Sequence, residues 1–316
     1  MNALNSDKIT NIKKKELFLF WYKIDGKRQN FGDVLGTYLI ENLSGLKVVY
    51  VPIVFSSLID FVRYIYGIFK GYNSFVDLGS LFRSRFSKSK TLISIGSIIG
   101  LYKKSNYYNI WGSGIIDRNV EVKDANFLAV RGKYTQNRLK ELGYKVPIVI
   151  GDPALLLPLV YNPDVEKSYK LGLIPHYVQF DEIAKIVNDP EILIIDLLDD
   201  IEKVVKDIKS CQYTISSSLH GIIVSHAYDV SSLWYNFPGG VLHGDNIKFY
   251  DYFSSVDIDN YDSFNITDFK NINSDKIIDN IRNTCKMDII RIKIKNIQRE
   301  LIKVAPFEVV EKYRVL

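Results

Sequence analysis

Short apolar runs alternate with segments of helical periodicity along most of the chain. In the first half the runs are apolar on both faces and rich in β-branched or aromatic residues, which is typical of strands covered on both sides. They occupy residues 17–21, 48–51, 92–95, 127–130 and 146–150. Helical patterns at 33–42 and 134–142 lie between them, and Gly143 follows the second pattern where a C-terminal cap is expected. This alternation predicts α/β layers built on a parallel sheet.

The alternation stops at residues 151–167 and then starts again. Pro153, Pro158 and Pro163 interrupt this stretch, and because proline lacks a backbone donor we expect no regular element here. Apolar runs then return at residues 170–174, 192–195, 212–215 and 232–235, separated by helical patterns at 201–208 and 219–227. The sequence therefore predicts two Rossmann-like domains facing a central cleft. We place them at residues 1–158 and 159–316, the second ending in a helical segment.

That last segment, residues 275–303, has two interpretations. Isoleucine and leucine residues recur in it at helical spacing, and lysine and arginine residues supply a basic side. The pattern fits a helix whose apolar face packs on the body while its basic face is in water. This is the favoured interpretation. The alternative is a helix that lies on an anionic lipid surface.

Composition and charge narrow the class of protein. The chain has 316 residues, of which 47% are hydrophobic and 24% charged, as in an ordinary folded protein of about two domains. Its net charge of +5 suits an anionic small substrate but is too diffuse to indicate nucleic-acid binding. Cys211 and Cys285 are far apart and form no CxxC pair, which excludes a disulfide scaffold and a cysteine-rich zinc site.

The sequence also bears on location. Residues 1–15 are polar and contain several lysines, unlike a secretory signal. No run approaches about 18 uninterrupted apolar residues, and the richest candidate, residues 61–69, is broken by Arg63. We therefore expect a cytoplasmic protein, which contacts the inner membrane face if residues 275–303 lie on lipid.

Ligands of open α/β sheets bind beyond the carboxyl ends of the strands, and four places in this sequence meet that description. The first is Asn30-Phe31-Gly32-Asp33. Asn30 or Asp33 can cap the following helix, and Gly32 lets backbone amides approach a ligand. Simple helix capping explains this segment equally well.

The second place is a pair of glycine-rich turns, Gly96-Ser97-Ile98-Ile99-Gly100 and Trp111-Gly112-Ser113-Gly114. Such turns can hold a carboxylate or phosphate with their backbone amides. Their spacing does not match the dinucleotide-binding fingerprint, and turns without a ligand are the alternative.

The third place is Arg131, which stands at the end of an apolar strand. Its planar guanidinium could bind a carboxylate or phosphate through two hydrogen bonds. A surface salt bridge is the alternative.

The fourth place is Tyr213-Thr214-Ile215-Ser216-Ser217-Ser218-Leu219-His220-Gly221, where a β run leads through three serines into a helix. The hydroxyls of Ser217 and Ser218 and the free amides at Leu219 and Gly221 predict an anion site. Beside an anion, His220 is stabilised as a cation and can donate a proton. His226 is interpreted as a packing residue. His176, which follows another strand, either lines the cleft or is structural.

Together these segments resemble the polysaccharide pyruvyl transferase family. The matching pieces cover roughly residues 16–255 in the family's order: Asn30-Phe31-Gly32-Asp33, Ser94-Ile95-Gly96-Ser97, Trp111-Gly112-Ser113-Gly114, Ala129-Val130-Arg131-Gly132, Gly151-Asp152-Pro153-Ala154 and Ser218-Leu219-His220-Gly221. The resemblance implies a fold like that of the two-domain GT-B glycosyltransferases. It also implies phosphoenolpyruvate as donor, no further cofactor or metal, and a hexose acceptor in a capsule, exopolysaccharide or cell-wall precursor.

The resemblance implies functional roles for two residues. Arg131 matches an arginine implicated in donor binding, and His220 matches the histidine implicated in catalysis. Some members place a second arginine two residues before that histidine, where this chain has Ser218. Lys248 and His176 are therefore the candidates for the second cationic donor ligand.

Two other classes of protein compete with this hypothesis. A glycosyltransferase of the same architecture would bind a nucleotide sugar and would not respond to phosphoenolpyruvate. A non-catalytic glycan-binding protein would need neither Arg131 nor His220 at strand ends, which argues against it.

Overall fold

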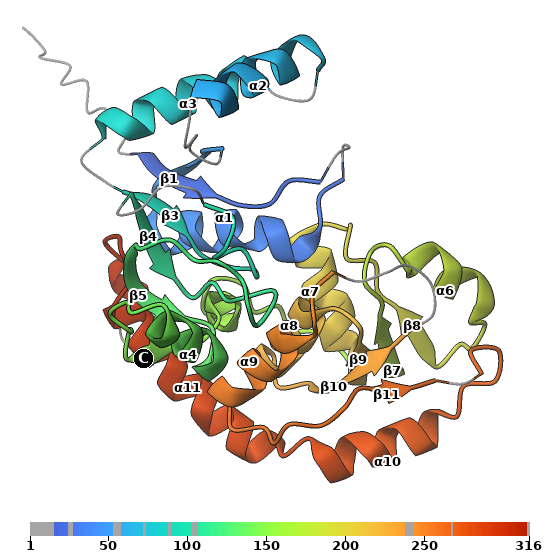
Figure 1. Ribbon diagram of the computed structural model, residues 1–316. Coiled ribbons are helices and arrows are strands. Elements are labelled where there is room, and N and C mark those ends of the chain that lie inside the picture. Colours follow the sequence, from blue (N-terminus) through green and yellow to red (C-terminus); the bar gives the residue numbers. More distant parts are fainter. Residues whose placement is uncertain are drawn as a thin grey trace, which may run out of the picture.

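The structure is a computed structural model that describes residues 16–24, 28–52, 58–71, 74–87, 90–102, 107–237, 243–266 and 268–314. Two parallel β-sheets, each with helices packed against it, form the core of these residues (Figure 1). The predicted α/β class with two Rossmann-like sheets is therefore confirmed. None of the helices in these described ranges is both long and apolar enough to cross a membrane.

The first sheet has six parallel strands in the order β2-β1-β3-β4-β5-β6. Its strands are β1 (Glu16–Phe20), β2 (Lys47–Tyr50), β3 (Thr91–Ile93), β4 (Tyr108–Trp111), β5 (Asn126–Val130) and β6 (Val149–Ile150). Its helices are α1 (Phe31–Ser44), α2 (Leu58–Phe69), α3 (Phe75–Phe86) and α4 (Lys133–Glu141). The sequence pattern missed β4, which is short and carries the polar Asn109. As predicted, Gly143 follows α4 in the left-handed conformation, with φ of 78°.

The second sheet has five parallel strands in the order β11-β10-β9-β7-β8. Its strands are β7 (Tyr169–Ile174), β8 (Ile192–Ile194), β9 (Cys211–Ser216), β10 (Ser231–Asn236) and β11 (Phe264–Asn265). The helices of this half are α6 (Phe180–Ile186), α7 (Ile201–Ser210), α8 (Leu219–Ala227), α9 (Ile247–Ser255), α10 (Ser274–Thr284) and α11 (Met287–Lys303). A short 3₁₀ turn, η2 (Glu311–Tyr313), follows them.

The proline-containing connection between the sheets is helical over residues 153–160, so the expectation of no regular element was wrong there, but it is confirmed for residues 161–167. A 3₁₀ turn, η1 (Pro153–Leu156), leads directly into α5 (Leu157–Val160). Proline is tolerated in the first turn of a helix, where its missing N–H would have no partner, and Pro153 and Pro158 both occupy such positions. The Asp152 side chain caps η1 by accepting from the amide of Ala154 at 2.9 Å.

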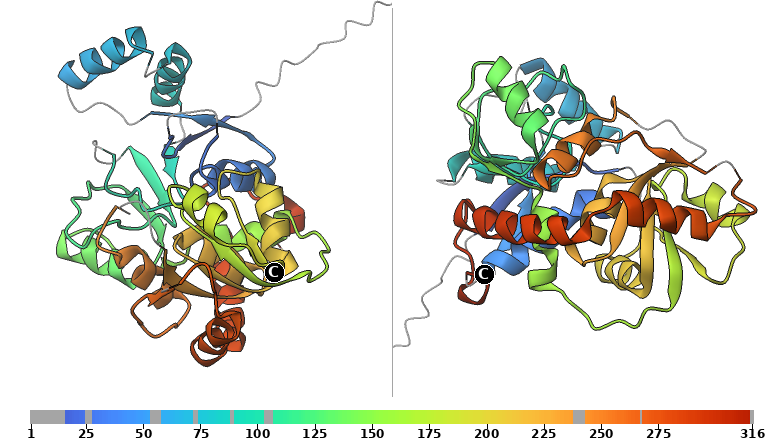
Figure 2. Two further views of the ribbon diagram at one scale, coloured as in Figure 1. Left: turned by 90° about the vertical axis from the view of Figure 1, so that its right-hand side faces the viewer. Right: turned by 90° about the horizontal axis from the view of Figure 1, so that it is seen from below.

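The C-terminal helices pack against the body. Ile290, Ile294 and Leu301, which recur at the predicted helical spacing, are buried, whereas Ile289 is 45% exposed. Trp111 Nε1 in β4 donates to the Leu301 carbonyl at 3.0 Å, and Gln298 Nε2 donates to the Leu155 carbonyl at 2.7 Å. Figure 2 shows α11 running beneath both sheets. This favours the packed-helix interpretation, because most of the apolar face of α11 is buried against the body.

Residues 297–313 thus pack on the first domain although they follow the second in sequence. Besides the Trp111 contact, the amide of Val310 donates to the carbonyl of Leu43 at the end of α1, at 2.8 Å. The domain boundary at residue 158 stays a prediction.

Candidate active site

Each sheet has a point where the strand order reverses, and the predicted site residues follow the strands at these points. In the first sheet the reversal lies between β1 and β3, and in the second between β7 and β9. Asn30 to Asp33 come after β1, and Gly96 and Ser97 come after β3. His176 follows β7, and Ser217 to His220 follow β9. Such reversal points are where ligands bind in open α/β sheets.

The N-termini of α1 and α8 meet between the two domains. His220, the second residue of α8, packs so closely on Gly32 that a Cβ atom built on Gly32 would lie 2.2 Å from its Nδ1. In the same region the amide of Phe31 donates to the carbonyl of Leu197 in the second domain at 2.7 Å. Only glycine at position 32 allows the histidine of one domain to lie against the helix of the other.

Asp152 faces the other side of the His220 ring. Its Oδ2 lies 3.7 Å from His220 Nε2, within ion-pair distance when the histidine is protonated. Asp152 is fully buried, and neither of these two atoms has a hydrogen-bond partner among the described residues. The carboxylate can therefore stabilise an imidazolium at His220. Asp152 was not among the predicted site residues, although it belongs to the Gly151-Asp152-Pro153-Ala154 segment that resembles the family.

Asp33 adds a second carboxyl group next to His220. Burial raises the pKa of Asp33, while a 2.9 Å hydrogen bond from Asn30 Nδ2 opposes that rise. Asn30 occupies the N-cap position of α1, as expected, but its side chain accepts no helix amide. The amide of Asp33 donates instead to the backbone carbonyl of Asn30 at 3.0 Å, while the Asn30 side chain binds the Asp33 carboxylate.

Much of the serine cluster before α8 is used in holding the strand ends together. Ser217 Oγ accepts from the amide of His176 at 2.9 Å and donates to Gln179 at 2.6 Å. Ser216 Oγ accepts from the amide of Ser218 at 2.9 Å. No side chain caps α8, so its first turn, which includes Leu219, has amides available to an anion. Gly221 packs directly on Ser216 and keeps the turn close to β9.

The two glycine-rich turns bind each other. The amide of Gly114 and the hydroxyl of Ser113 both donate to the carbonyl of Gly96, at 3.1 and 2.9 Å. Gly96 has φ of 110°, which favours glycine. Gly112 lies against Pro153, where a Cβ atom would come within 2.1 Å of the proline ring. Some of the backbone and hydroxyl groups of these turns are therefore already hydrogen-bonded to each other, and these bonds hold the ends of β3 and β4 together.

Arg131 lies fully buried inside a polar network. Its Nε donates to Asp251 at 3.0 Å, its Nη1 to Ser97 Oγ at 2.6 Å and its Nη2 to the carbonyl of Ile115 at 2.7 Å. Asp251 also accepts from the amide and hydroxyl of Thr135, at 2.8 and 2.6 Å. The surface salt bridge considered as an alternative is thus wrong, because the ion pair is internal. A ligand would reach this guanidinium most directly by displacing the partly exposed Ser97.

Lys248, in α9, lies near both Arg131 and His176. Burial, together with the nearby Arg131, lowers the pKa of Lys248 to about 8. Burial, with Lys248 and His243 close by, lowers the pKa of His176 to about 4, so this histidine is neutral near pH 7. Of the two candidates for a second cationic ligand, Lys248 alone carries a charge at that pH. His226 is a packing residue, as interpreted, since its ring nitrogens lie 2.9 Å from Tyr252 Oη and 3.0 Å from the carbonyl of Ser232.

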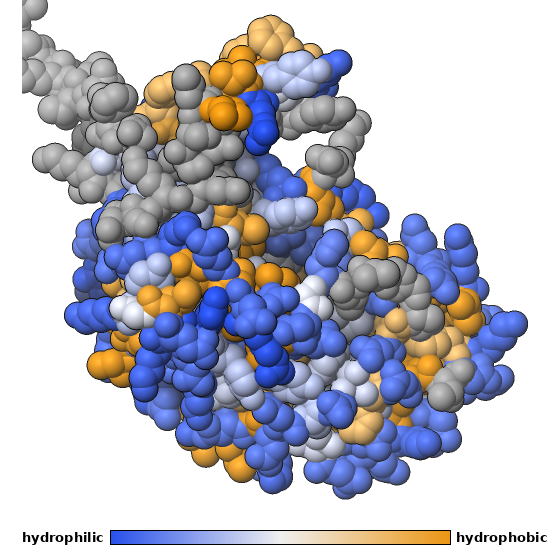
Figure 3. Space-filling view, in the orientation of Figure 1, coloured by the Kyte–Doolittle hydropathy of each residue, from blue (hydrophilic) through white to orange (hydrophobic). Residues whose placement is uncertain are grey.

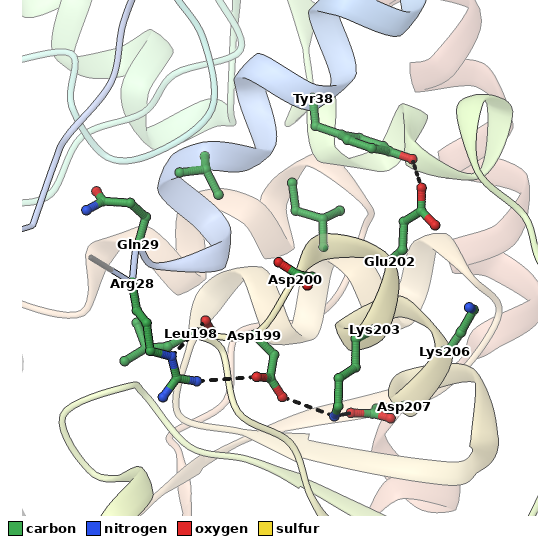
Figure 4. A pocket seen from close by; sticks show the side chains of 12 residues that line it. Arg28, Gln29, Tyr38, Leu198, Asp199, Asp200, Glu202, Lys203, Lys206 and Asp207 are labelled. Carbon is green, nitrogen blue, oxygen red and sulfur yellow. Dashed lines mark hydrogen bonds and ion pairs between the residues drawn. The ribbon is translucent and has the colours of Figure 1, made fainter. Parts of the chain in front are cut away.

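A separate pocket of about 840 Å³ opens between α1 and α7, away from His220 (Figure 4). Arg28 closes one side of it, with hydrogen bonds to Asp196 at 2.5 Å and Asp199 at 3.3 Å. Tyr38 donates to Glu202 at 3.1 Å on the other side. None of the predicted site residues lines this pocket, so its contacts serve mainly to join the domains.

The arrangement around His220 can bind an anion and transfer a proton. The free turn of α8 and Lys248 attract negative charge, and His220 has carboxyl groups near it at Asp152 and Asp33. Within the described ranges, no group of three or more histidine, cysteine, aspartate or glutamate side chains is placed to hold a metal ion.

Comparisons with known proteins bear on these residues. A family model described as polysaccharide pyruvyl transferase matches residues 30–237, from the N-cap of α1 to the end of the second sheet's β10. The uncharacterized protein L143 of Acanthamoeba polyphaga mimivirus is 36% identical over 173 residues, which cover 52% of this chain. The chain spans 60% of the length of that relative.

Solved structures were also compared. The E. coli heptosyltransferase WaaC with ADP-2-deoxy-2-fluoro heptose is 11% identical, with a TM-score of 0.36 over 85% of this chain and 99% of that one. The same enzyme with ADP is 10% identical, with a TM-score of 0.36 over 86% of this chain and all of the other.

The Arg131–Asp251 pair generates a stability prediction. Asp251→Ala should lower the free energy of unfolding by about 3–5 kcal/mol, because it leaves a buried guanidinium without its counter-charge. Urea denaturation at neutral pH measures this change. Asp279→Ala is the matched control, since Asp279 is exposed and pairs with Arg282 at 3.8 Å. Its loss should cost less than about 1 kcal/mol. Equal effects of the two substitutions would contradict the importance of the buried pair.

Proposed function

The chain belongs to the polysaccharide pyruvyl transferase family, and on that premise we propose that it uses phosphoenolpyruvate to form a pyruvate ketal on a hexose of a surface polysaccharide or its precursor. Membership of this family supports a role in transferring a pyruvyl group to a polysaccharide. The identity of the donor and of the hexose acceptor is our proposal. The observation that supports it best is the meeting of α1 and α8, where His220 lies between Gly32 and Asp152.

The donor in this proposal binds at the N-terminus of α8. Phosphoenolpyruvate carries a phosphate and a carboxylate, and the uncapped amides of the first helical turn suit either group. Ser218 is the N-cap residue of α8, so its hydroxyl lies beside these amides, and Lys248 supplies a cation. Arg131 takes part if the donor displaces Ser97 from the guanidinium. These residues give an anionic donor two kinds of positive partner, helix amides and side-chain cations.

The reaction requires one proton for the methylene carbon of the donor and two hydroxyl groups of the sugar to form the ketal. Protonation of the donor's methylene carbon leaves an oxocarbenium-like centre at C2, and one sugar hydroxyl attacks it. The C2–O bond to phosphate then breaks, and the neighbouring hydroxyl closes the ring. One of the two hydroxyl protons ends in the new methyl group and the other leaves with the phosphate. The balance needs no oxidant or reductant.

His220 is the proposed acid in this scheme. Its Nε2 is buried and faces Asp152, while its Nδ1 packs against Gly32 at the start of α1. Asp152 stabilises the protonated ring, as a carboxylate does for a catalytic histidine elsewhere. Asp33 is the proposed base for the attacking hydroxyl, because its raised pKa makes it a better proton acceptor.

The proposal is tested by incubating the purified protein with phosphoenolpyruvate and a panel of hexose-containing acceptors. We expect release of inorganic phosphate that depends on both substrates, and a ketal methyl signal in the product by NMR. Phosphoenolpyruvate should also raise the melting temperature, since a ligand of the folded state stabilises it. A shift with nucleotide sugars and none with phosphoenolpyruvate would favour a glycosyltransferase instead.

His220→Asn should fold normally and lower turnover by about 10²–10⁴-fold, the usual contribution of acid–base assistance. Asp152→Asn keeps the oxygen that caps η1 but removes the charge beside His220, so it should also lower kcat while leaving the donor KM nearly unchanged. His226→Asn is not a useful control because it is buried. Asn42→Ala on the exposed part of α1 is suitable and should leave turnover unchanged. Normal turnover of folded His220→Asn would exclude its role as the acid.

Donor affinity should depend on pH through Lys248. Since the pKa of its ammonium group is lowered to about 8, Lys248 is charged at pH 7 and loses its proton as the pH rises above 8. Calorimetry should therefore show the Kd for phosphoenolpyruvate rising between pH 7 and 9, by at most about tenfold per unit above the pKa. Lys248→Met should bind weakly throughout this range and lose the pH dependence. The exposed Lys206→Met variant should keep it, and a pH-dependent Lys248→Met would refute the assignment.

A further inference from the structure

Helices α2 and α3 carry an apolar surface that the rest of the described chain does not cover. Figure 1 shows them above β1, on the far side of the first sheet from the second domain. Large side chains on them are exposed, among them Phe69 at 78% and Phe75 at 65%. Figure 3 shows hydrophobic residues gathered there at the top of the molecule. Exposed apolar clusters of this kind mark interaction surfaces.

The exposed residues form a stripe on each helix. On α2 they are Ile59, Val62, Tyr66 and Phe69, whose spacing of three, four and three residues puts them on one helix face. On α3, Phe75 and Phe82 are seven residues apart and share a face as well. The opposite face of α3 holds the helix on the body, since Leu81 is buried and Ser80 donates to the carbonyl of Tyr50 at 2.5 Å. The outward stripes are therefore not part of the protein core.

Positive charge accompanies the stripes. Residues 58–90 contain six lysines and arginines against two aspartates, a net charge of +4 in a chain whose total is +5. Arg63 and Lys70 are exposed, and each directly follows an exposed apolar residue, Val62 and Phe69. One of the two aspartates, Asp77, is already paired with a lysine outside this segment, since Lys23 Nζ lies 3.4 Å from Asp77 Oδ2. Apolar anchors interleaved with cations are typical of a helix at the interface of an anionic bilayer.

We propose that α2 and α3 dock this protein on the surface of anionic membranes, with the apolar side chains among the acyl chains and the cations at the headgroups. A second copy of this chain fits the surface less well, because a symmetric contact would bring the cations of both copies together. The proposal goes beyond pyruvyl transfer and does not depend on it. It also moves the membrane contact away from residues 275–303, whose apolar face is mostly buried.

Co-sedimentation with vesicles tests the proposal. The wild-type protein should pellet with phosphatidylcholine vesicles containing 30% phosphatidylglycerol, and much less with phosphatidylcholine alone. Salt should weaken the binding, since it screens exposed charges. Phe69→Ser/Phe75→Ser should bind at least about tenfold more weakly, and Arg63→Gln/Lys70→Gln should lose most of the preference for anionic vesicles. Because all four side chains are exposed, circular dichroism should show an unchanged fold.

Ile289→Ser/Ile292→Ser on α11 is the matched control, because these side chains are also exposed, at 45% and 62%. It should bind vesicles like the wild type. The proposal is overturned if the wild type stays in the supernatant with anionic vesicles at low salt, or if the α2–α3 variant binds as tightly as the control. A dimer that these substitutions dissociate, without vesicle binding by the wild type, would assign the surface to a second copy. Activity on soluble substrates is a separate readout that the α2–α3 variants should retain.

Discussion

The buried ion pair between Arg131 and Asp251 is the interaction on which the arrangement of this protein depends. A charged guanidinium without solvent needs a counter-charge, and the chain supplies it from α9, which comes after the second sheet in sequence. This requirement holds α9 on α4 and β5 of the first sheet, and Lys248 at the start of α9 is thereby placed beside Arg131. The pair therefore joins the domains and sets the electrostatics of the region between them.

The candidate site depends on this contact between the domains. Because the domains are held together, Gly32 packs against His220, and Asp152 lies on the other side of the histidine ring. None of the three is special by itself, since a glycine at a helix start and a histidine in a first turn are common. Together they bring a histidine, a carboxylate and a helix N-terminus without a side-chain cap close to one another, which is the combination that the proposed anionic donor and acid-catalysed step require.

Two amphipathic patterns show how burial decides function. The isoleucines of 275–303 recur at helical spacing beside basic residues, and so do the apolar residues of α2. In the first case most of the apolar face is buried, and Trp111 and Leu155 make hydrogen bonds to the same helix. In the second the stripe from Ile59 to Phe69 is exposed. Hydrophobic periodicity reports that a helix has an apolar face, but not what covers it.

The sequence by itself determined the α/β class, most of the strands, the Gly143 cap and the segments that meet around His220, because these depend on local periodicity and turn chemistry. It missed β4, β11 and the helical turns at Pro153 and Pro158, where neighbouring elements outweigh weak local signals. The tertiary structure alone decided that Arg131 is an internal ion pair, that Asp152 faces His220 and that the side chain of Asn30 binds Asp33 instead of a helix amide. Each of these is a contact between side chains or domains whose partner cannot be read from local sequence, since it exists only once the two sheets are packed together.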